Sequence, residues 1–261
     1  MPQPTDLPPR GTAEMSVWDH LEELRWVVVR AVIGIIVGIV ICAVFGDFIL
    51  KEIVLAPAQR TTPPMKLINT EVFGQLSLYM MVAIWGGVIL SFPYTLISVW
   101  QFISPGLHQH EKKYVAQLSF FTVLLFVLGM SFAYFVMLPM SLDFAVEFGT
   151  LDIANLVDIG KYLSLFLQVI ILSGLVFELP AVSYFLSKMG ILTPAFMRHY
   201  RRHTIVILLL LSAILSPGGN PLLQLILFVP LWALFELSIG SSALVERKRR
   251  KAELANGGTS A

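Results

Sequence analysis

Acidic side chains stand at the ends of the apolar segments of this 261-residue chain, where they could bind a cation. Glu22 and Glu23 precede the first apolar run, and Glu111 follows the second. A carboxylate accepts paired hydrogen bonds from a guanidinium group, so carboxylates displayed on helix ends suit a cationic peptide. The same acids could instead form weak surface pairs, Glu22 and Glu23 with Arg25, and Glu111 with one of the two lysines that follow it. The spacing alone leaves both interpretations open.

A different acid, Glu178, interrupts the otherwise uncharged stretch Tyr162–Ser187. In a helix it lies about 15 Å from Lys188 and so near the middle of a bilayer, where an ionised carboxylate costs at least about 2.5 kcal/mol. It could belong to a proton pathway, contact a partner's transmembrane segment, or be a protonated acid that is hydrogen-bonded within the bundle. Gln224, near the start of the last apolar run, could likewise bond to a neighbouring helix.

The other reactive side chains give weaker indications. Cys42 is the single cysteine and lies in the first apolar run, which favours packing over a redox role. The pairs His108/His110 and His199/His203 have a possible ligand spacing, but no Cys or carboxylate cluster completes a metal site in the sequence. The sequence lacks HExxH, GxSxG and a phosphate-binding Gly-rich loop, so we predict neither an enzyme nor a cofactor.

The composition places these residues in a membrane protein. The chain is 56% hydrophobic and 13% charged, against about 25% charged residues in a typical soluble domain. Its net charge of +1 excludes a broad nucleic-acid-binding surface. The loop Ser141–Gly160 carries acids, among them Asp158, whose default interpretation is solvation.

A spanning helix needs about 20 mostly apolar residues. Such stretches occur at Trp26–Gly46, within Val72–His110, within Tyr114–Leu142, at Tyr162–Ser187 and within His203–Phe235. Arg30 interrupts the first stretch one turn from its start, where it can extend to the headgroups. The last stretch contains Ser216–Pro221, whose prolines and glycines predict a turn that divides it into two arms.

The distribution of basic residues favours six spans with both termini in the cytoplasm. Only Lys51, Arg60, Lys66 and Lys161 of the 18 basic residues then lie outside. Thr204–Leu215 is about 18 Å of helix against a hydrocarbon core of about 30 Å, so we expect the fifth helix, and with it the sixth, to be short. We predict a disordered segment at residues 1–15, one membrane domain at 16–245 and a basic cytoplasmic tail at 246–261.

The constellation resembles the TatC family, the multispanning core of the twin-arginine (Sec-independent) protein translocase. The resemblance runs from about Ser16 to Val245. It rests on His20–Arg25 before the first span, Phe102–Lys113 between the second and third, Phe177–Pro180 in the fourth, and the proline-containing turn before Gln224.

The resemblance implies a concave, glove-like bundle of six spans that recognises signal peptides with consecutive arginines. By matching position, Glu23 and Glu111 would receive the arginine pair, and Phe102 and Leu107 would shape that cytoplasmic site. Arg25 belongs to the same signal-peptide-binding motif. One departure is Asn220, which stands where the family usually has an Asp and removes a negative charge.

The resemblance also implies partners. Glu178 matches the family's intramembrane acid, and Gln224 matches its polar contact for a single-span protein. We therefore expect binding of folded cargo in the bacterial cytoplasmic (inner) membrane, assembly with TatA-like and TatB-like proteins, self-association, and energy from the proton gradient. The alternative is a proton-coupled small-solute transporter that uses Glu178. It predicts several polar residues at the midplane, whereas most of the predicted spans are almost purely apolar there.

Overall fold

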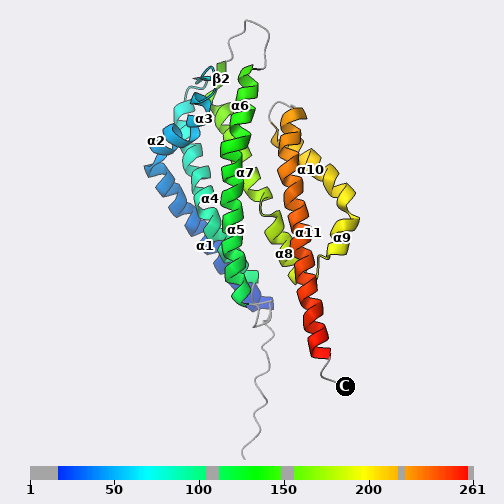
Figure 1. Cartoon of the computed structure of the whole chain (residues 1–261). Helices are drawn as coiled ribbons and strands as arrows, with labels where there is room; N and C mark the ends of the chain where they lie inside the picture. The colour runs from blue at the N-terminus through cyan, green and yellow to red at the C-terminus, as the bar shows by residue number, and fades with distance from the viewer. Residues whose placement is uncertain (1–16, 104–111, 148–155, 217–220, 258–261) are drawn as a thin grey trace, which may run out of the picture.

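The computed structural model describes residues 17–103, 112–147, 156–216 and 221–257, which form an almost entirely helical bundle (Figure 1). Its elements in chain order are α1 (Val17–Val44), α2 (Gly46–Phe48), the π-helix η1 (Ile49–Val54), α3 (Ala56–Gln59), β1 (Lys66–Ile68), α4 (Gly74–Ile103), α5 (Lys112–Phe132), the π-helix η4 (Ala133–Met137), α6 (Leu138–Glu147), β2 (Leu156–Asp158), α7 (Ile159–Val176), α8 (Leu179–Lys188), α9 (Pro194–His199), α10 (Arg201–Leu215) and α11 (Pro221–Gly257). The predicted helical fold class is confirmed. Residues 1–15 lie outside the described part.

Within the described residues, five helical segments are long and apolar enough to cross a bilayer. They are Leu21–Val44, Gly74–Trp100, Ser119–Glu147, Ile159–Lys188 and Gln224–Arg247. The chain is therefore a multi-pass membrane protein. The predicted fifth helix corresponds to α10, which has 15 residues, or about 22 Å of helix, and is short as expected.

The expectation that the sixth helix is short is wrong. α11 has 37 residues and continues through the basic segment to Gly257 without a break. The uncharged run His203–Phe235, from which the helix length was predicted, ends where charge begins at Glu236. Glu, Lys, Arg and Ala are good helix formers, however, so a charged segment can prolong a helix beyond its apolar part.

Figure 1 shows that α1 begins and α11 ends at the same end of the bundle, here called the basal end. α4 ends and α5 begins there as well. The opposite end, here called the strand end, carries the parallel pair β1 and β2, in which Lys66, Leu67 and Ile68 lie opposite Leu156, Val157 and Asp158. An even number of helical passages along the bundle brings the chain back to the basal end.

α1 and α4 pack at backbone distance. A Cβ atom added to Gly38 would lie 2.5 Å from the carbonyl oxygen of Gly87, and one added to Gly87 would lie 2.4 Å from the Ile39 nitrogen. Small residues allow this approach, which replaces the hydrophobic driving force that is missing between helices in lipid. Gly34 and Gly38, four positions apart on α1 in a GxxxG pattern, thus face α4 of the same chain.

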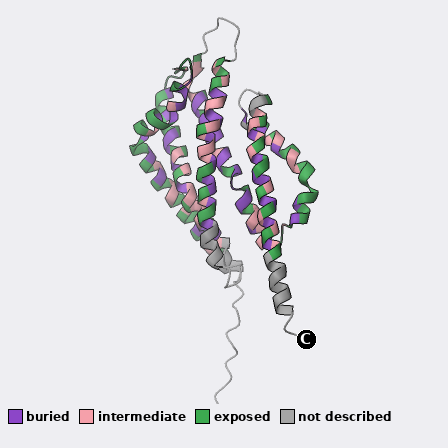
Figure 2. Cartoon of the chain, in the orientation of Figure 1, coloured by how far each residue is buried: buried purple, intermediate pink, exposed green. Residues whose placement is uncertain are grey.

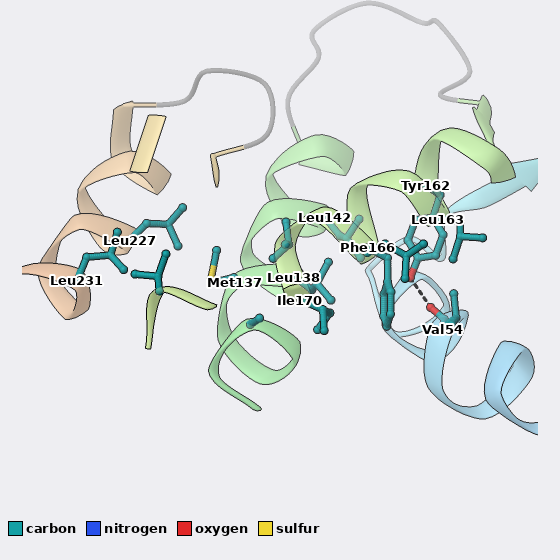
Figure 3. Close-up of a cluster of buried hydrophobic side chains, with 14 of the residues drawn as sticks. Val54, Met137, Leu138, Leu142, Tyr162, Leu163, Phe166, Ile170, Leu227 and Leu231 are labelled. Carbon is teal, nitrogen blue, oxygen red and sulfur yellow. Dashed lines mark hydrogen bonds between the residues drawn. The ribbon is translucent and has the colours of Figure 1, made fainter. Parts of the chain in front are cut away.

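The core of the bundle lies around α7. Leu163, Val169 and Leu138 are fully buried, and residues of α11 such as Leu227 and Leu231 pack into the same cluster (Figure 3). Figure 2 shows exposed residues along the outer helices, especially α1. These exposed side chains are mostly Val, Ile and Leu, which suits a surface that faces lipid.

Hydrogen bonds to Asp158 connect the segments at the strand end. Asp158 caps α7, since its carboxylate accepts hydrogen bonds from the backbone nitrogens of Gly160 (2.9 Å) and Lys161 (3.1 Å). The same carboxylate accepts from the hydroxyl (2.5 Å) and the nitrogen (3.2 Å) of Thr70. The Thr70 hydroxyl, followed by the α7 nitrogens, lowers the pKa of Asp158 below its ordinary value. Asp158 therefore joins two loops, beyond the solvating role expected from the sequence.

Candidate functional site

A cavity of about 370 Å³, here called the basal pocket, lies between the start of α1 and the end of α4. It is lined by Glu22, Glu23, Trp26, Val27, Arg30, Ser98 and Phe102. The α1 residues share one face because they are three or four positions apart, and Ser98 and Phe102 share a face of α4 for the same reason. The close α1–α4 contact at Gly38 and Gly87 holds these two faces together.

Glu23 is the partly buried acid of this pocket. Its Oε2 atom is buried and has no hydrogen-bond partner among the described residues. A buried polar oxygen is normally paired, because an unpaired one costs about 1–3 kcal/mol. Within the described residues, the pocket therefore contains a carboxylate oxygen whose capacity to accept a hydrogen bond is unused.

The alternative of local ion pairs does not hold at α1. Arg25 is exposed and does not line the basal pocket. In the part of the chain that the structure describes, neither Glu22 nor Glu23 forms a salt bridge with it. The two carboxylates are thus not neutralised by their nearest basic neighbour.

Two of the predicted site residues, Glu111 and Leu107, lie outside the described residues. The helices on either side of them, α4 and α5, end and begin at the basal end, close to the start of α1 (Figure 1). Phe102, the predicted aromatic residue, lines the basal pocket directly. A meeting of Glu23 with Glu111 stays a prediction.

Glu178 lies at the break between α7 and α8. Pro180 stands in the first turn of α8, and a proline cannot donate the backbone hydrogen bond that would continue α7. Glu178 is only 6% exposed, and within the described residues neither carboxylate oxygen has a hydrogen-bond partner. The hydrogen-bonded arrangement considered from the sequence is therefore not formed there. A pathway for small solutes or protons would need further polar groups bonded to this acid.

Gln224 bonds within the chain. Its side-chain nitrogen donates to the Leu209 carbonyl at 3.0 Å and so ties α11 to α10. The sequence-based expectation of a bond to a neighbouring helix is confirmed, whereas contact with a partner protein stays a prediction. Gln168 makes a similar bond from α7 to the Ile214 carbonyl at 3.3 Å, which the sequence analysis missed. Asn220 lies outside the described residues.

The sequence analysis also missed an ion pair. Arg201 Nη2 lies 2.5 Å from Glu236 Oε2 and joins the start of α10 to the middle of α11. The signal that the sequence offered for this ion pair was an acid, Glu236, with a residue of opposite charge, Arg201, at the start of the preceding helix.

A second cavity, of about 1200 Å³ and here called the apolar groove, lies among α5, α8 and α11. Its lining includes Phe121, Leu125, Pro180, Tyr184, Trp232, Leu234, Leu237 and Leu244, with Glu236 and Arg247 as the charged members. It is large enough, and apolar enough, to hold part of an apolar peptide helix.

The described residues contain no group of three or more His, Cys, Asp or Glu side chains that could hold a metal ion. His199 and His203 instead lie beside the ring of Tyr200, at centroid distances of 5.1 and 5.6 Å. His108 and His110 lie outside the described residues.

Comparison with known proteins gives one consistent result. The sequence model of a family described as "Sec-independent protein translocase protein (TatC)" matches residues 19–230. The chain is 34% identical to the Sec-independent protein translocase protein TatC of Carboxydothermus hydrogenoformans, over 92% of this chain and 97% of that protein. It is 31% identical to the TatC protein of Aquifex aeolicus, over 92% of this chain and 100% of that protein.

The fold is similar to a crystal structure of the twin arginine translocase receptor TatC. The TM-score is 0.76 at 32% sequence identity, and the match covers 87% of this chain and 99% of that chain.

Proposed function

Because the chain belongs to the TatC family of Sec-independent protein translocase components, which are not enzymes, we propose that it is the receptor of the translocase for signal peptides with consecutive arginines. The observation that carries this proposal is the buried Glu23 Oε2 atom in the basal pocket, which has no hydrogen-bond partner among the described residues. An arginine guanidinium would supply the missing donor in a charge-assisted, paired geometry. Glu111 would receive the second arginine, while Phe102 and Leu107 would shape the site, with Arg25 in the same motif.

The apolar groove would hold the apolar stretch of the same signal peptide. Its walls come from α5, α8 and α11, and Trp232 and Phe121 offer large aromatic contacts. The signal peptide would thus bind through polar contacts at its arginines and through apolar contacts in the groove along its apolar stretch.

We further propose six spans in a concave, glove-like bundle, with α10 as the short fifth crossing. The return of the chain to the basal end supports an even number of crossings (Figure 1). The basic segment that starts at Arg247 lies at that end and, by the positive-inside rule, would place it in the cytoplasm. The membrane would be the bacterial cytoplasmic (inner) membrane, with residues 1–15 and 246–261 as its cytoplasmic extensions.

Single-span TatA-like and TatB-like proteins would assemble around α7, α8, α10 and α11, together with further copies of the chain. Glu178 supports this part of the proposal, because a buried acid without a described partner can accept a polar contact from another transmembrane helix. The proton gradient would supply the energy, since the sequence has no nucleotide-binding motif.

The test is peptide binding to the full chain in lipid nanodiscs. A fluorescent signal peptide with two arginines should bind the wild type more tightly than its twin-lysine analogue, and Glu23→Ala combined with Glu111→Ala should remove that preference. Glu52→Ala changes an exposed acid of η1 and serves as the matched control. An unchanged preference in the double variant would overturn the proposal.

A further inference from the structure

A basic surface lies where α9 passes into α10, at the edge of the bundle (Figure 2). It is here called the basic patch, and its exposed side chains are those of Phe196, Arg198, His199, Tyr200, Arg202 and His203. The sequence contains no Asp or Glu between Glu178 and Glu236. Within the described chain, neither Arg198 nor Arg202 forms an ion pair, so both guanidinium groups lack an anionic partner there.

The backbone holds the side chains of the basic patch on one surface. The backbone nitrogens of Tyr200 and Thr204 donate to the carbonyls of Phe196 and Tyr200 at 3.1 and 3.0 Å, so helical hydrogen bonds continue across the junction of α9 and α10. Arg198 and Arg202, four positions apart, therefore share a face. The rings of Phe196 and Tyr200 lie beside them, with centroids 4.6 Å apart. The patch thus combines two arginines with aromatic rings of the kind that favour a membrane interface.

Arg201 fixes the depth of the basic patch in the bundle, since it pairs with Glu236 of α11. Glu236 lies six residues, or about 9 Å of helix, before Ser242. The Ser242 hydroxyl accepts a hydrogen bond at 2.6 Å from Ser187, at the end of α8. The start of α10 is thus recessed by about 9 Å from the end of α8, toward the middle of the bundle. A charge at such a depth in a membrane is costly without a counter-ion.

An exposed apolar stripe continues from the basic patch along α10. It consists of Val206, Ile207 and Leu210, which are 56%, 61% and 61% exposed. Val206 follows Arg202 by four residues and Leu210 follows Val206 by four, so the stripe and the arginine share a face. A guanidinium group binds phosphate oxygens through paired hydrogen bonds. A ligand with a phosphate and an acyl chain would match the patch and the stripe together, whereas a free phosphate would match the patch alone.

We propose that the basic patch and the apolar stripe form a binding site for one anionic phospholipid. Its phosphate binds Arg198 and Arg202, and an acyl chain lies along Val206, Ile207 and Leu210. Basic surfaces beside transmembrane helices are suited to such headgroups. The inference goes beyond the proposed function, because it depends neither on a signal peptide nor on the basal pocket.

The experiment measures lipid retained by the full chain, by native mass spectrometry from detergent. The probes are phosphatidylglycerol and phosphatidylcholine with the same acyl chains, which differ in net charge. The wild type should bind its first phosphatidylglycerol molecule at least about fivefold more tightly than phosphatidylcholine. Arg198→Gln combined with Arg202→Gln should weaken that binding by at least about tenfold, and one lipid molecule fewer should remain bound. Arg198→Lys combined with Arg202→Lys keeps both charges and should retain most of the preference.

Two controls test where the lipid binds and what part of it is recognised. Arg60→Gln removes an exposed arginine of the α3 end, outside the basic patch, and should leave phosphatidylglycerol binding at its wild-type value. Glycerol phosphate carries the phosphate without acyl chains and should not displace the lipid at an equal concentration.

Four results would overturn the lipid site. These are equal affinity of the wild type for the two lipids, unchanged phosphatidylglycerol binding in the double glutamine variant, and an equal loss of binding in Arg60→Gln. The fourth is displacement by glycerol phosphate, which would identify a site for a free phosphate instead.

Discussion

The carboxylates at the two ends of the bundle differ in their hydrogen-bond partners. At the strand end, Asp158 accepts hydrogen bonds from Thr70 and from the start of α7, and all of these donors belong to the chain itself. At the basal end, Glu23 keeps a buried oxygen without a described partner, in a pocket that opens beside it. Both are acids beside the start of a membrane span, so residue type alone does not separate them.

The difference separates structural from functional polar groups. A satisfied acid stabilises a junction and has little left to offer a ligand, whereas an unsatisfied one is costly until a ligand arrives. By this criterion Asp158 and Tyr162 belong to the scaffold, whereas Glu23 and Glu178 are the acids for which we propose a partner from another molecule.

The largest expected effect comes from breaking the α1–α4 contact that supports the basal pocket. Gly87→Ala would place a Cβ atom 2.4 Å from the Ile39 nitrogen, so the helices must separate, at a cost of about 2 kcal/mol. Stability and peptide binding should fall together, as measured by thermal unfolding in detergent and by peptide titration. Gly240→Ala is the matched control for stability alone, because a Cβ atom there meets nothing within 4 Å while Gly240 lines the apolar groove. Unchanged stability in Gly87→Ala would contradict the contact.

The next largest effect concerns the strand end alone. The Tyr162 hydroxyl donates to the buried carbonyl of Val54 at 2.5 Å (Figure 3). Tyr162→Phe removes the donor and leaves that carbonyl unpaired, so the free energy of unfolding should fall by about 1 kcal/mol. Affinity for a twin-arginine peptide should not change. A loss of affinity without a loss of stability would contradict the assignment of Tyr162 to the scaffold.

Gln224 tests whether a polar side chain that is hydrogen-bonded within the chain is only structural. Its bond to the Leu209 carbonyl makes it part of the scaffold, and Gln224→Leu should lower stability by about 0.6 kcal/mol, a typical value for a side-chain bond between membrane helices. If it also contacts a single-span partner, copurification of that partner should weaken by more than the small loss of stability explains.

The smallest effect is the pH dependence of the stability that the hydrogen bonds of Asp158 provide at the strand end. The pKa of Asp158 is lowered in the folded chain, so its contribution to stability is present above the unfolded value of about 3.9 and is lost as the pH falls through the folded value. Thermal unfolding of the wild type below about pH 4 should therefore lose stability that Asp158→Asn, whose side chain can still cap α7, does not lose. Parallel pH profiles for the two proteins would rule out this role of Asp158.

Much of the fold could be predicted from the sequence, because lipid imposes long apolar stretches that are plain in the residues. The short α10 followed from the turn at Ser216–Pro221. The length of α11 was missed because the end of the apolar run at Phe235 was taken as the end of the helix, whereas the charged residues that follow are good helix formers. The α1–α4 contact could not be predicted either, because the GxxxG pattern of Gly34 and Gly38 does not say which helix it contacts.

The candidate site was predictable in residue type and not in environment. The sequence indicates acids before the first span, but it does not show that Glu23 shares a pocket with Ser98 and Phe102 of α4, or that its Oε2 atom is buried without a partner among the described residues. The position of Arg30 in the same pocket is a second example. A cation near a helix end suggests contact with headgroups, and only the shared pocket shows that it lies beyond the two acids.

A double-mutant cycle between Glu23 of the receptor and the arginines of the peptide tests the central claim most directly. The four affinities come from the wild type and Glu23→Gln, each titrated with the twin-arginine peptide and with a peptide in which one arginine is glutamine, and the cycle is run for each arginine. If one guanidinium binds Glu23, its coupling energy should be at least about 1.5 kcal/mol, as found for close charge pairs at interfaces. Coupling near zero for both arginines would contradict the account.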